Sequence, residues 1–477
     1  MNNCVETYIL EVLTSVRCKK AHQQIRDELT SHIEDLREEY EAQGISSEEA
    51  TQRAVSAMGD ASEVGQKLNR QHKPQMGWGI LLLTAAISLF GVLSMCITQP
   101  PERYGGSMEN YLTFMAIGAL FLVGIYFFDY TRLKKHPFWI YLLSVLLVFM
   151  CSKFGYSIAG TRRYLSFGII SLYIPGTAAV LYLISFCGFL ERFRNQGWTG
   201  IFKLLGLAFV AFCSLLELPC FAFAFILTVA CAVVLLRAIY QNHFSADGKV
   251  QFWSLFLTGS TLFIIMMIVH IYLEPYRTER IMMFLNKGAA DPLGSGWVYM
   301  IADKIMRASK WIGKAGPIPE GDIAYLMPDL TGDFALLNIV SSYGKLIGLL
   351  VIITVSVLIV RMFAISRRVK YSFGRNLSLS CCVILSVQFI YNILMNLGFA
   401  PIMGVTLPFV SYGGSLYLIN SVCVGLILSV WRQNNILAAE QFAAPKKSFS
   451  RISFVDNKLV IDFSDYFGDF SEDYFEE

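Results

Sequence analysis

The chain has 477 residues, of which 55% are hydrophobic and 16% charged, and its formal net charge is +3 at pH 7. Soluble globular proteins carry about 25% charged residues, so this composition excludes a mainly soluble protein, a disordered chain and a secreted disulfide scaffold. The small net charge, dispersed over loops, provides no footprint for nucleic acid. The eleven cysteines lie mostly within apolar runs without CxxC spacing, which favours small core residues over a metal or redox set.

Residues 1–75 are charged and predict a small helical bundle. Ile25, Leu29 and Ile33 fall on one helical face, and Gly44 follows as a helix stop. Two pairs with capping-box spacing predict two further short helices: Ser46 with Glu49, and Asp60 with Glu63. No apolar segment near Met1 suggests a cleaved signal peptide, so we expect the N-terminus in the cytoplasm.

Ten apolar runs of the length needed to cross a bilayer follow. They span residues 78–97, 111–128, 137–151, 175–190, 201–216, 220–236, 253–271, 346–362, 377–397 and 416–430. Lys and Arg concentrate in the loops after the second, fourth, sixth and eighth runs, which places those loops and both termini in the cytoplasm. The sequence therefore predicts an all-α polytopic membrane protein with ten transmembrane helices, residues 77–432, preceded by a cytoplasmic helical bundle.

Three segments outside the runs stand out. Arg162 and Arg163 fall in an outside loop, where they either meet lipid headgroups or form a guanidinium fork for a phosphate or pyrophosphate. Residues 272–345 form one long outside region rich in Gly, Pro and charge. The cytoplasmic tail, 433–477, turns acidic and aromatic, and we expect it to be disordered alone and either to dock a partner or merely to solubilise the chain.

Several local patterns occur on the predicted outside half. They are Asn396-Leu397-Gly398, Leu407-Pro408 with Ser411-Tyr412-Gly413-Gly414-Ser415, Tyr276 with Arg280, Asp291-Pro292, and Pro328 with Asp333-Phe334. Proline and glycine that interrupt a segment at membrane depth release backbone groups toward a cavity. On the cytoplasmic side, Asp129-Tyr130 opens a basic loop.

Together these patterns resemble the SEDS family of peptidoglycan polymerases, the FtsW/RodA/SpoVE group, most closely at Pro408–Ser415, which is similar to LPxxSYGGS. Residues 1–75 separately resemble the "permease prefix" domain of bacterial membrane proteins, which implies a bacterial source. The SEDS resemblance implies polymerisation of lipid II at the outer face of the cytoplasmic membrane. It also implies an undecaprenyl-pyrophosphate-linked substrate, surrounding membrane lipids and a class B penicillin-binding protein as partner.

The resemblance assigns roles only where residues match. Asp333 occupies the family's acidic position, as general base, although an Asp that opens a helix is equally well explained as an N-cap. Arg163 matches an Arg suited to a pyrophosphate leaving group. The other residues that the resemblance places at the substrate are Arg162, Arg280, Ser411, Tyr412, Gly413, Gly414 and Ser415. No metal ligands are identified, and a divalent cation stays open as a cofactor.

The chain also departs from the family pattern. Residues 173–179 replace QPSE-x-x-K and so lack its carboxylate and its Lys; residues 219–223 replace PDLGT; and Ser341-Ser342 stand where the family has paired Glu. Glu217 is a candidate compensating group. Three hypotheses follow: an active lipid II glycosyltransferase, a catalytically lapsed paralogue that binds a lipid-linked precursor or acts as a scaffold of a cell-wall synthase, and a transporter of lipid-linked precursors.

Overall fold

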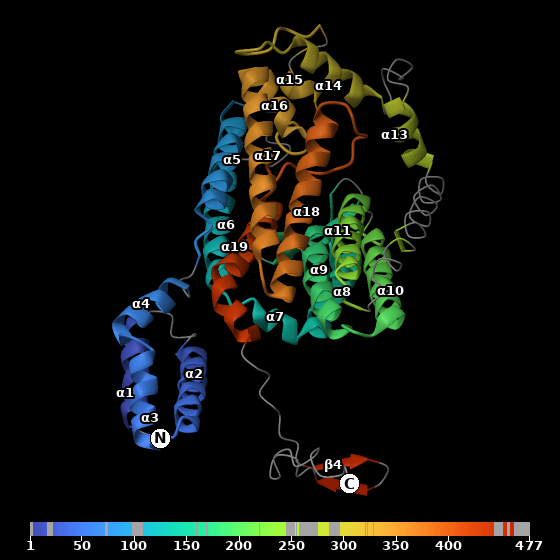
Figure 1. Cartoon of the computed structure of the whole chain (residues 1–477). Coiled ribbons are helices and arrows are strands. Elements are labelled where there is room, and N and C mark those ends of the chain that lie inside the picture. Colours follow the sequence, from blue (N-terminus) through green and yellow to red (C-terminus); the bar gives the residue numbers. More distant parts are fainter. Residues whose placement is uncertain are drawn as a thin grey trace. The chain divides into compact units, whose positions relative to one another are not determined.

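The computed structural model describes residues 3–16, 22–71, 75–97, 108–158, 161–167, 170–218, 220–244, 253, 255–256, 275–285, 296–319, 321, 323–327, 329–442, 452–455 and 458–461. The chain divides into two compact units, Met1–Arg70 with Ala438–Glu477, and Gln71–Leu437 (Figure 1).

The N-terminal segment folds into four helices around one apolar cluster. They are α1 (Asn3–Ser15), α2 (His22–Ala42), α3 (Ser47–Ala57) and α4 (Ala61–Gln71). Ile25, Leu29 and Ile33 of α2 pack in this cluster with Val12 of α1. The sequence predicts α1 only as part of the helical segment 1–75, although its Val12 is fully buried.

The helix signals of this segment act through different groups. Gly44 and Gly59 have φ of +87° and +83°, the left-handed region in which glycine ends a helix without strain. Asp60 Oδ2 accepts the N–H of Glu63 at 3.1 Å, as a cap should. Ser46 is the N-cap residue of α3, as predicted, but its side chain makes no cap hydrogen bond. The predicted start of the helix is therefore confirmed, whereas the hydrogen bond of a capping box is not formed by Ser46.

Nine helices in the described part of the chain are long and apolar enough to cross a membrane. They are α5 (Trp78–Ile97), α6 (Met108–Phe127), α8 (Pro137–Phe154), α9 (Ile174–Arg192), α10 (Gly197–Leu216), α11 (Phe221–Tyr240), α17 (Lys345–Arg368), α18 (Ser372–Asn396) and α19 (Gly414–Phe442). Each lies on one of the predicted apolar runs. The predicted run 253–271 falls almost entirely outside the described residues, so the expected count of ten stays a prediction.

Burial separates a central from a peripheral set of helices. In their most apolar windows, α9, α18 and α19 are 83%, 72% and 78% buried, whereas α6 and α8 are 17% and 22% buried. The peripheral helices therefore present apolar side chains such as Leu120 and Phe149 outward, where a bilayer would cover them. The central helices are tightly packed: a Cβ on Gly374 of α18 would come within 2.6 Å of the Tyr130 hydroxyl.

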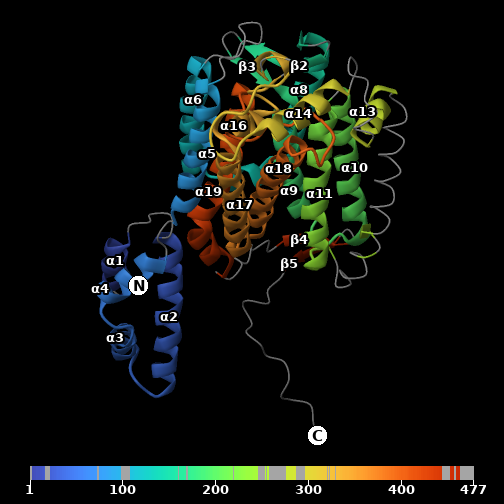
Figure 2. The same cartoon turned by 90° about the horizontal axis from the view of Figure 1, so that it is seen from above.

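Shorter elements connect the spans. They are α7 (Thr131–Lys135), α13 (Pro275–Leu285), α14 (Trp297–Ala308), α15 (Ile323–Leu326) and α16 (Ala335–Tyr343), with strands β1 (Tyr156–Ile158), β2 (Thr161–Phe167), β3 (Ile170–Tyr173), β4 (Ile452–Val455) and β5 (Lys458–Ile461). Strands β1, β2 and β3 pair antiparallel in that order. We call the end of the membrane unit that carries β1–β3 and α14–α16 the outer end, after the predicted topology (Figure 2).

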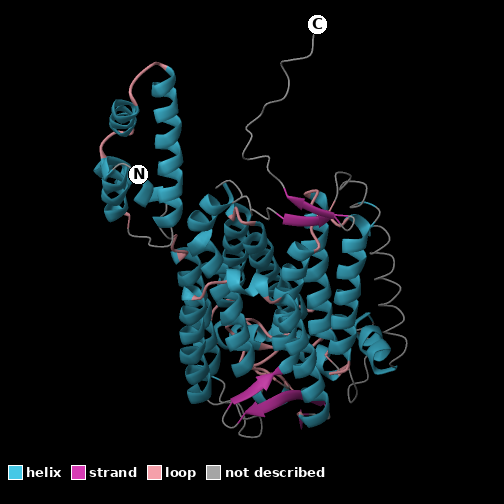
Figure 3. Cartoon of the chain, turned by 90° about the horizontal axis from the view of Figure 1, so that it is seen from below, coloured by secondary structure: helices cyan, strands magenta, loops and turns pink. Residues whose placement is uncertain are grey.

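The predicted helical membrane fold is confirmed, and short strands occur in addition to the helices. Figure 3 shows two small sheets, one at the outer end of the membrane unit and one in the tail. The outer sheet forms in the loop that follows the third predicted run, where Tyr164 pairs with Tyr156 on one side and with Tyr173 on the other. The second sheet is a hairpin of β4 and β5 within the tail, for which the sequence predicts disorder. The acidic residues 462–477 lie outside the described part of the chain.

Candidate active site

The predicted base, Asp333, lies in a tight turn of residues 329–334 that leads into α16. The Asp329 carboxylate closes this turn, because its Oδ2 accepts the N–H of Asp333 at 3.0 Å. Asp329 has φ of +53°, which Asp tolerates better than most residues. Gly332 is required here, since a Cβ at that position would overlap the Asp329 carboxylate. The sequence Asp-Leu-Thr-Gly-Asp therefore encodes the turn itself.

Asp333 is not the N-cap residue of α16. That helix begins at Ala335 with Phe334 as its N-cap residue. The N–H of Leu337 in its first turn donates to Oδ1 of Asn396 at 3.0 Å. The structure thus gives Phe334 as the N-cap residue of α16, and the general-base role of the Asp333 carboxylate stays a prediction.

Two asparagines of α18 hold the backbone of Asp333. Nδ2 of Asn392 donates to the Asp333 carbonyl at 2.8 Å, and Nδ2 of Asn396 donates to the same carbonyl at 3.0 Å. Asn392 also donates to the carbonyl of Val405 at 2.6 Å. Both asparagines are buried. Hydrogen bonds thus hold both the N–H and the carbonyl of Asp333. Because this backbone is fixed, the protein determines the direction in which the half-buried side chain leaves it.

The predicted substrate segment 411–415 is engaged with the turn. Ser411 Oγ donates to the Gly332 carbonyl at 2.6 Å and accepts the Leu407 N–H at 2.8 Å. The N–H of Tyr412 donates to the Thr331 carbonyl at 2.8 Å, and Ser415 Oγ donates to the Ser171 carbonyl in β3.

Ser411 and Ser415 use their side chains in these bonds, and packing requires one of the two glycines between them. A Cβ on Gly414, the first residue of α19, would overlap the ring of Phe114, whereas one on Gly413 would meet only ordinary contacts. Contact of Ser411, Tyr412, Gly413, Gly414 and Ser415 with substrate stays a prediction. What the structure adds is that the motif braces the turn that carries Asp333.

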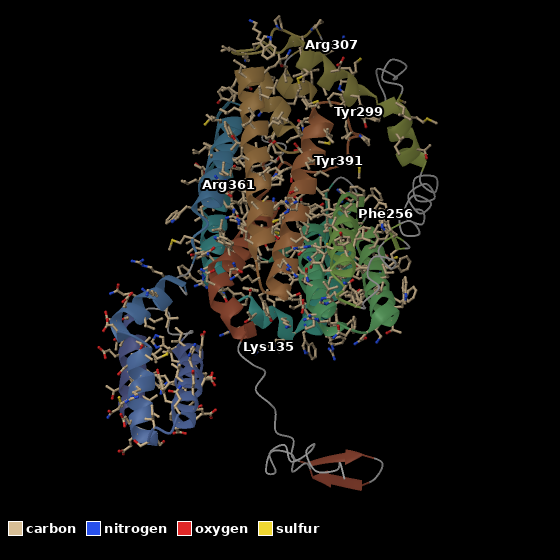
Figure 4. All side chains as sticks on the ribbon, in the orientation of Figure 1. Lys135, Phe256, Tyr299, Arg307, Arg361 and Tyr391 are labelled. Atoms are coloured by element: carbon tan, nitrogen blue, oxygen red, sulfur yellow. The ribbon has the colours of Figure 1, made fainter. Side chains whose placement is uncertain are left out.

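The segment before this motif is braced in the same way. Tyr299 of α14 accepts the N–H of Ile402 at 2.8 Å, and the Tyr391 hydroxyl of α18 donates to the Pro401 carbonyl at 2.9 Å. Figure 4 shows both tyrosines on the upper part of the membrane unit, from different helices. Gly404 completes the segment, where a Cβ would lie 3.7 Å from Oδ2 of Asp333.

The two predicted arginines lie in strand β2 beside an irregularity in its pairing with β1, where Arg162 pairs with Ser157 and Tyr164 with Tyr156. Arg162 is exposed, and its Nη1 donates to the carbonyls of Ser152 and Lys153 at 3.2 and 3.1 Å, so it caps the end of α8. Arg163 is half-buried. A fork formed by both guanidinium groups therefore stays a prediction, and in this structure Arg162 is engaged by the backbone of α8.

The pKa of Tyr164 is affected by three charged residues of the site. Its pKa is raised to about 12, chiefly by burial; Asp329 and Asp333 act in the same direction, and Arg163 opposes them. Burial also raises the pKa of Tyr173, again against the charge of Arg163. One cation and two carboxylates therefore act electrostatically on the same tyrosine. These residues come from two segments that are far apart in the sequence.

The start of α9, where residues 173–179 replace the family's QPSE-x-x-K, is tightly packed. A Cβ on Gly176 would meet Leu416, Ile419 and Phe223 at 3.1 to 3.3 Å. Most of these residues are buried among apolar side chains. The segment that lacks the family's carboxylate and Lys is therefore part of the packed core.

Other predicted groups are not brought into the site. Glu217 is exposed and accepts a bond from Ser152 Oγ at 3.3 Å. Ser341, in place of one family Glu, donates to the Asn338 carbonyl at 3.0 Å. Arg280 belongs to α13, but its side chain lies outside the described residues, as do Asp291 and Pro328. Among the residues that the structure describes, no three His, Cys, Asp or Glu are grouped to hold a metal ion.

Sequence reasoning missed Asp329 and Asn392, and it named Asn396 only as part of a local pattern, without a role. A signal for the asparagines was present, because two buried amides four residues apart in an otherwise apolar span face one side of the helix and demand partners. Asp329 carried a weaker signal, an Asp three residues before a glycine.

Comparison with known proteins places this geometry in context. Residues 74–436 match the family of cell cycle proteins that comprises FtsW, RodA and SpoVE. A protein of Idiomarina loihiensis named "Probable peptidoglycan glycosyltransferase FtsW" is 29% identical over 303 residues, 62% of this chain and 71% of that protein. One of Hydrogenovibrio crunogenus with the same name is 26% identical over 362 residues, 74% of this chain and 90% of that protein.

Two solved structures share the fold. A chain from a peptidoglycan synthase complex that coordinates polymerization and crosslinking aligns with a TM-score of 0.62 and 22% identity, over 75% of this chain and 98% of that chain. Rod shape determining protein RodA of Thermus thermophilus aligns with a TM-score of 0.51 and 19% identity, over 75% of this chain and 97% of that chain.

Proposed function

The chain belongs to the FtsW, RodA and SpoVE family of cell cycle proteins, and we propose that it is a peptidoglycan glycosyltransferase that polymerises lipid II at the outer face of the cytoplasmic membrane. It is a multi-pass membrane protein. The observation that carries the proposal is the braced turn that holds Asp333 at the outer end, where Asp329 bonds its N–H and Asn392 and Asn396 bond its carbonyl. The relatives' names support the same activity.

In the proposed reaction a sugar hydroxyl attacks the anomeric carbon of a lipid-linked sugar, and undecaprenyl pyrophosphate leaves. Asp333 accepts the proton of the attacking hydroxyl, a general-base role worth about 100- to 10,000-fold in rate. Arg163 stabilises the negative charge that develops on the pyrophosphate, for which a planar guanidinium is well suited. Asn392 and Asn396 keep the base in place through its backbone.

A second candidate function is a catalytically lapsed member that binds a lipid-linked precursor or serves as a scaffold of a cell-wall synthase. The composition of residues 173–179 favours it, because this buried segment lacks the carboxylate and the Lys of the family pattern. The hydrogen bonds from Asp329, Asn392 and Asn396 that hold the Asp333 backbone favour the active enzyme.

We further propose a class B penicillin-binding protein as partner, which would cross-link the product. The support is the likeness to a chain from a peptidoglycan synthase complex in which the two activities are coordinated. Both termini would then lie in the cytoplasm and the site would face the partner's extracytoplasmic domain.

The decisive test is polymerisation of labelled lipid II by the purified full-length protein, alone and with class B penicillin-binding proteins. Asp333→Asn keeps the size of the side chain but loses the proton acceptor, so polymer formation should fall at least about 100-fold while yield and thermal stability stay unchanged. Asp303→Asn is the matched control, because Asp303 is exposed on α14 and pairs only with Arg307 of its own helix, at 2.9 Å.

Arg163 provides the second arm of this test. Arg163→Lys should retain more activity than Arg163→Ala, because lysine keeps the charge but not the bidentate geometry. Polymerisation at the normal rate by Asp333→Asn would refute the mechanism. A wild-type protein that makes no polymer with any partner, yet binds lipid II, would select the lapsed member instead.

A further inference from the structure

Asp329 is a second carboxylate in the turn that carries the proposed base. Its Oδ2 bonds the amide nitrogen of Asp333 at 3.0 Å. A carboxylate reaches no further than about 5 Å from the amide nitrogen of its own residue. The carboxylates of Asp329 and Asp333 are therefore within about 8 Å of each other, whatever the rotamer of Asp333.

The turn is built to keep Asp329 there. Positive φ at Asp329, a glycine at position 332 that avoids its carboxylate, and the 3.0 Å bond all specify one conformation. Desolvation by the surrounding protein raises the pKa of Asp329 although part of the residue is exposed, and the N–H groups of Asp333 and Gly332 lower it by favouring the charged form. An isolated turn would need only an uncharged acceptor such as Asn at this position.

A neighbouring negative charge matters because an ordinary aspartate is a weak base. The ordinary pKa of Asp is about 3.9, whereas a general base works best when its pKa is near the working pH. A like charge nearby makes the ionised form less favourable and so raises proton affinity.

We propose that Asp329 is a positioning residue for Asp333: its carboxylate fixes the backbone of the proposed base, and its negative charge makes the Asp333 carboxylate a stronger base. This inference rests on the proposed function. Tyr164 of the outer sheet lies within electrostatic reach of both carboxylates and of Arg163, and the uncharged Asn392 and Asn396 of α18 bond the Asp333 carbonyl. Among these groups Arg163 carries the opposing charge.

The first test is the pH dependence of lipid II polymerisation by the full-length protein with its partner. Asp329→Asn keeps an oxygen that can accept the Asp333 N–H and tolerates positive φ, but it removes the charge. The rate falls at low pH because the base becomes protonated, and this fall is the low-pH limb of the rate profile. Removal of the neighbouring negative charge makes Asp333 easier to ionise, so the limb should move to lower pH by about one unit. Asp303→Asn should leave the limb unchanged.

The second test does not need activity. A carbodiimide couples to protonated carboxyl groups, and peptide mass spectrometry gives the extent of coupling at Asp333 at each pH. In Asp329→Asn, the pH at which coupling to Asp333 is half-maximal should lie about one unit below that of the wild type. Asp303→Asn is again the control.

The outcomes separate the two proposals. If neither the low-pH limb of the rate nor the coupling midpoint of Asp333 shifts in Asp329→Asn, the inference is overturned and Asp329 only closes the turn. An equal loss of rate at every pH would lead to the same conclusion. A wild type that makes no polymer but shows the shifted coupling midpoint would refute the proposed function while keeping the electrostatic role of Asp329.

Discussion

Asn396 offers the sharpest test of how the protein holds the Asp333 turn. Asn396→Ala removes the donor to the Asp333 carbonyl at 3.0 Å, the donor to the Asn392 carbonyl at 2.9 Å and the acceptor of the Leu337 N–H at 3.0 Å. None of these bonds includes the Asp333 carboxylate. The substitution therefore loosens the proposed base without touching its chemistry.

The size of the effect follows from the two bonds that join Asn396 to the turn and to α16, since its bonds to the Asn392 carbonyl and Oδ1 stay within α18. Side-chain hydrogen bonds between membrane helices contribute about 0.6 kcal/mol each on average, so these two amount to about 1.2 kcal/mol. If all of this acts on the placement of Asp333, the rate falls about 7-fold, since each 1.4 kcal/mol is about a factor of ten. The free energy of unfolding should fall by no more than about 2 kcal/mol, the sum over all four bonds.

The assay pairs initial rates of lipid II polymerisation with thermal unfolding in detergent. Asn376→Ala is the matched control, because Asn376 is also buried in α18 but lies twenty residues away, about 30 Å along the helix. It should destabilise the protein similarly and leave the rate per folded molecule unchanged.

A double variant makes the reasoning refutable. If Asn396 acts only through Asp333, then Asn396→Ala should cost nothing further in the Asp333→Asn background. Fully additive losses of rate would show that Asn396 acts by another route, and an equal loss of rate in Asn376→Ala would reduce the effect to general destabilisation.

Two further predictions concern the parts around the site. An isolated fragment of residues 1–75 should show helical circular dichroism and a cooperative melt, because its four helices share one apolar cluster; a fragment that is coil at every temperature would contradict this. Single cysteines in a Cys-depleted protein should be labelled from the cytoplasmic side at positions 1 and 477 and from the outside at position 291, and labelling of 291 from the inside alone would reverse the predicted topology.

The membrane helices could be predicted because their signal is local and strong. A run such as 78–97 must be helical in lipid to satisfy its own backbone, and the helix indeed covers Trp78–Ile97. Boundaries extend beyond the apolar run where polar residues continue the helix, as at Arg368 of α17 and Ser372 of α18. Helix α1 was predicted only as part of the helical segment 1–75, although Ile9, Val12, Leu13 and Val16 have the spacing of one helical face and pack against the other helices.

The site is predictable only in part because its contacts are non-local. Asp333 and Arg163 were named through a family resemblance, and 170 positions separate them in the sequence. The bonds from Asn392 and Asn396 to the Asp333 carbonyl span 59 and 63 residues. A sequence shows that such polar groups need partners, but the fold decides which partners they receive.

The arginine pair shows how a strand changes what a loop would allow. In an unstructured loop, Arg162 and Arg163 could both turn toward one phosphate. In the structure they lie in strand β2 beside a pairing irregularity with β1, and Nη1 of Arg162 is held by the carbonyls of Ser152 and Lys153 at the end of α8. If Arg162 keeps these bonds, a pyrophosphate bound beside Asp333 would have to draw its cationic stabilisation from Arg163, which is what the proposed Arg163 variants test.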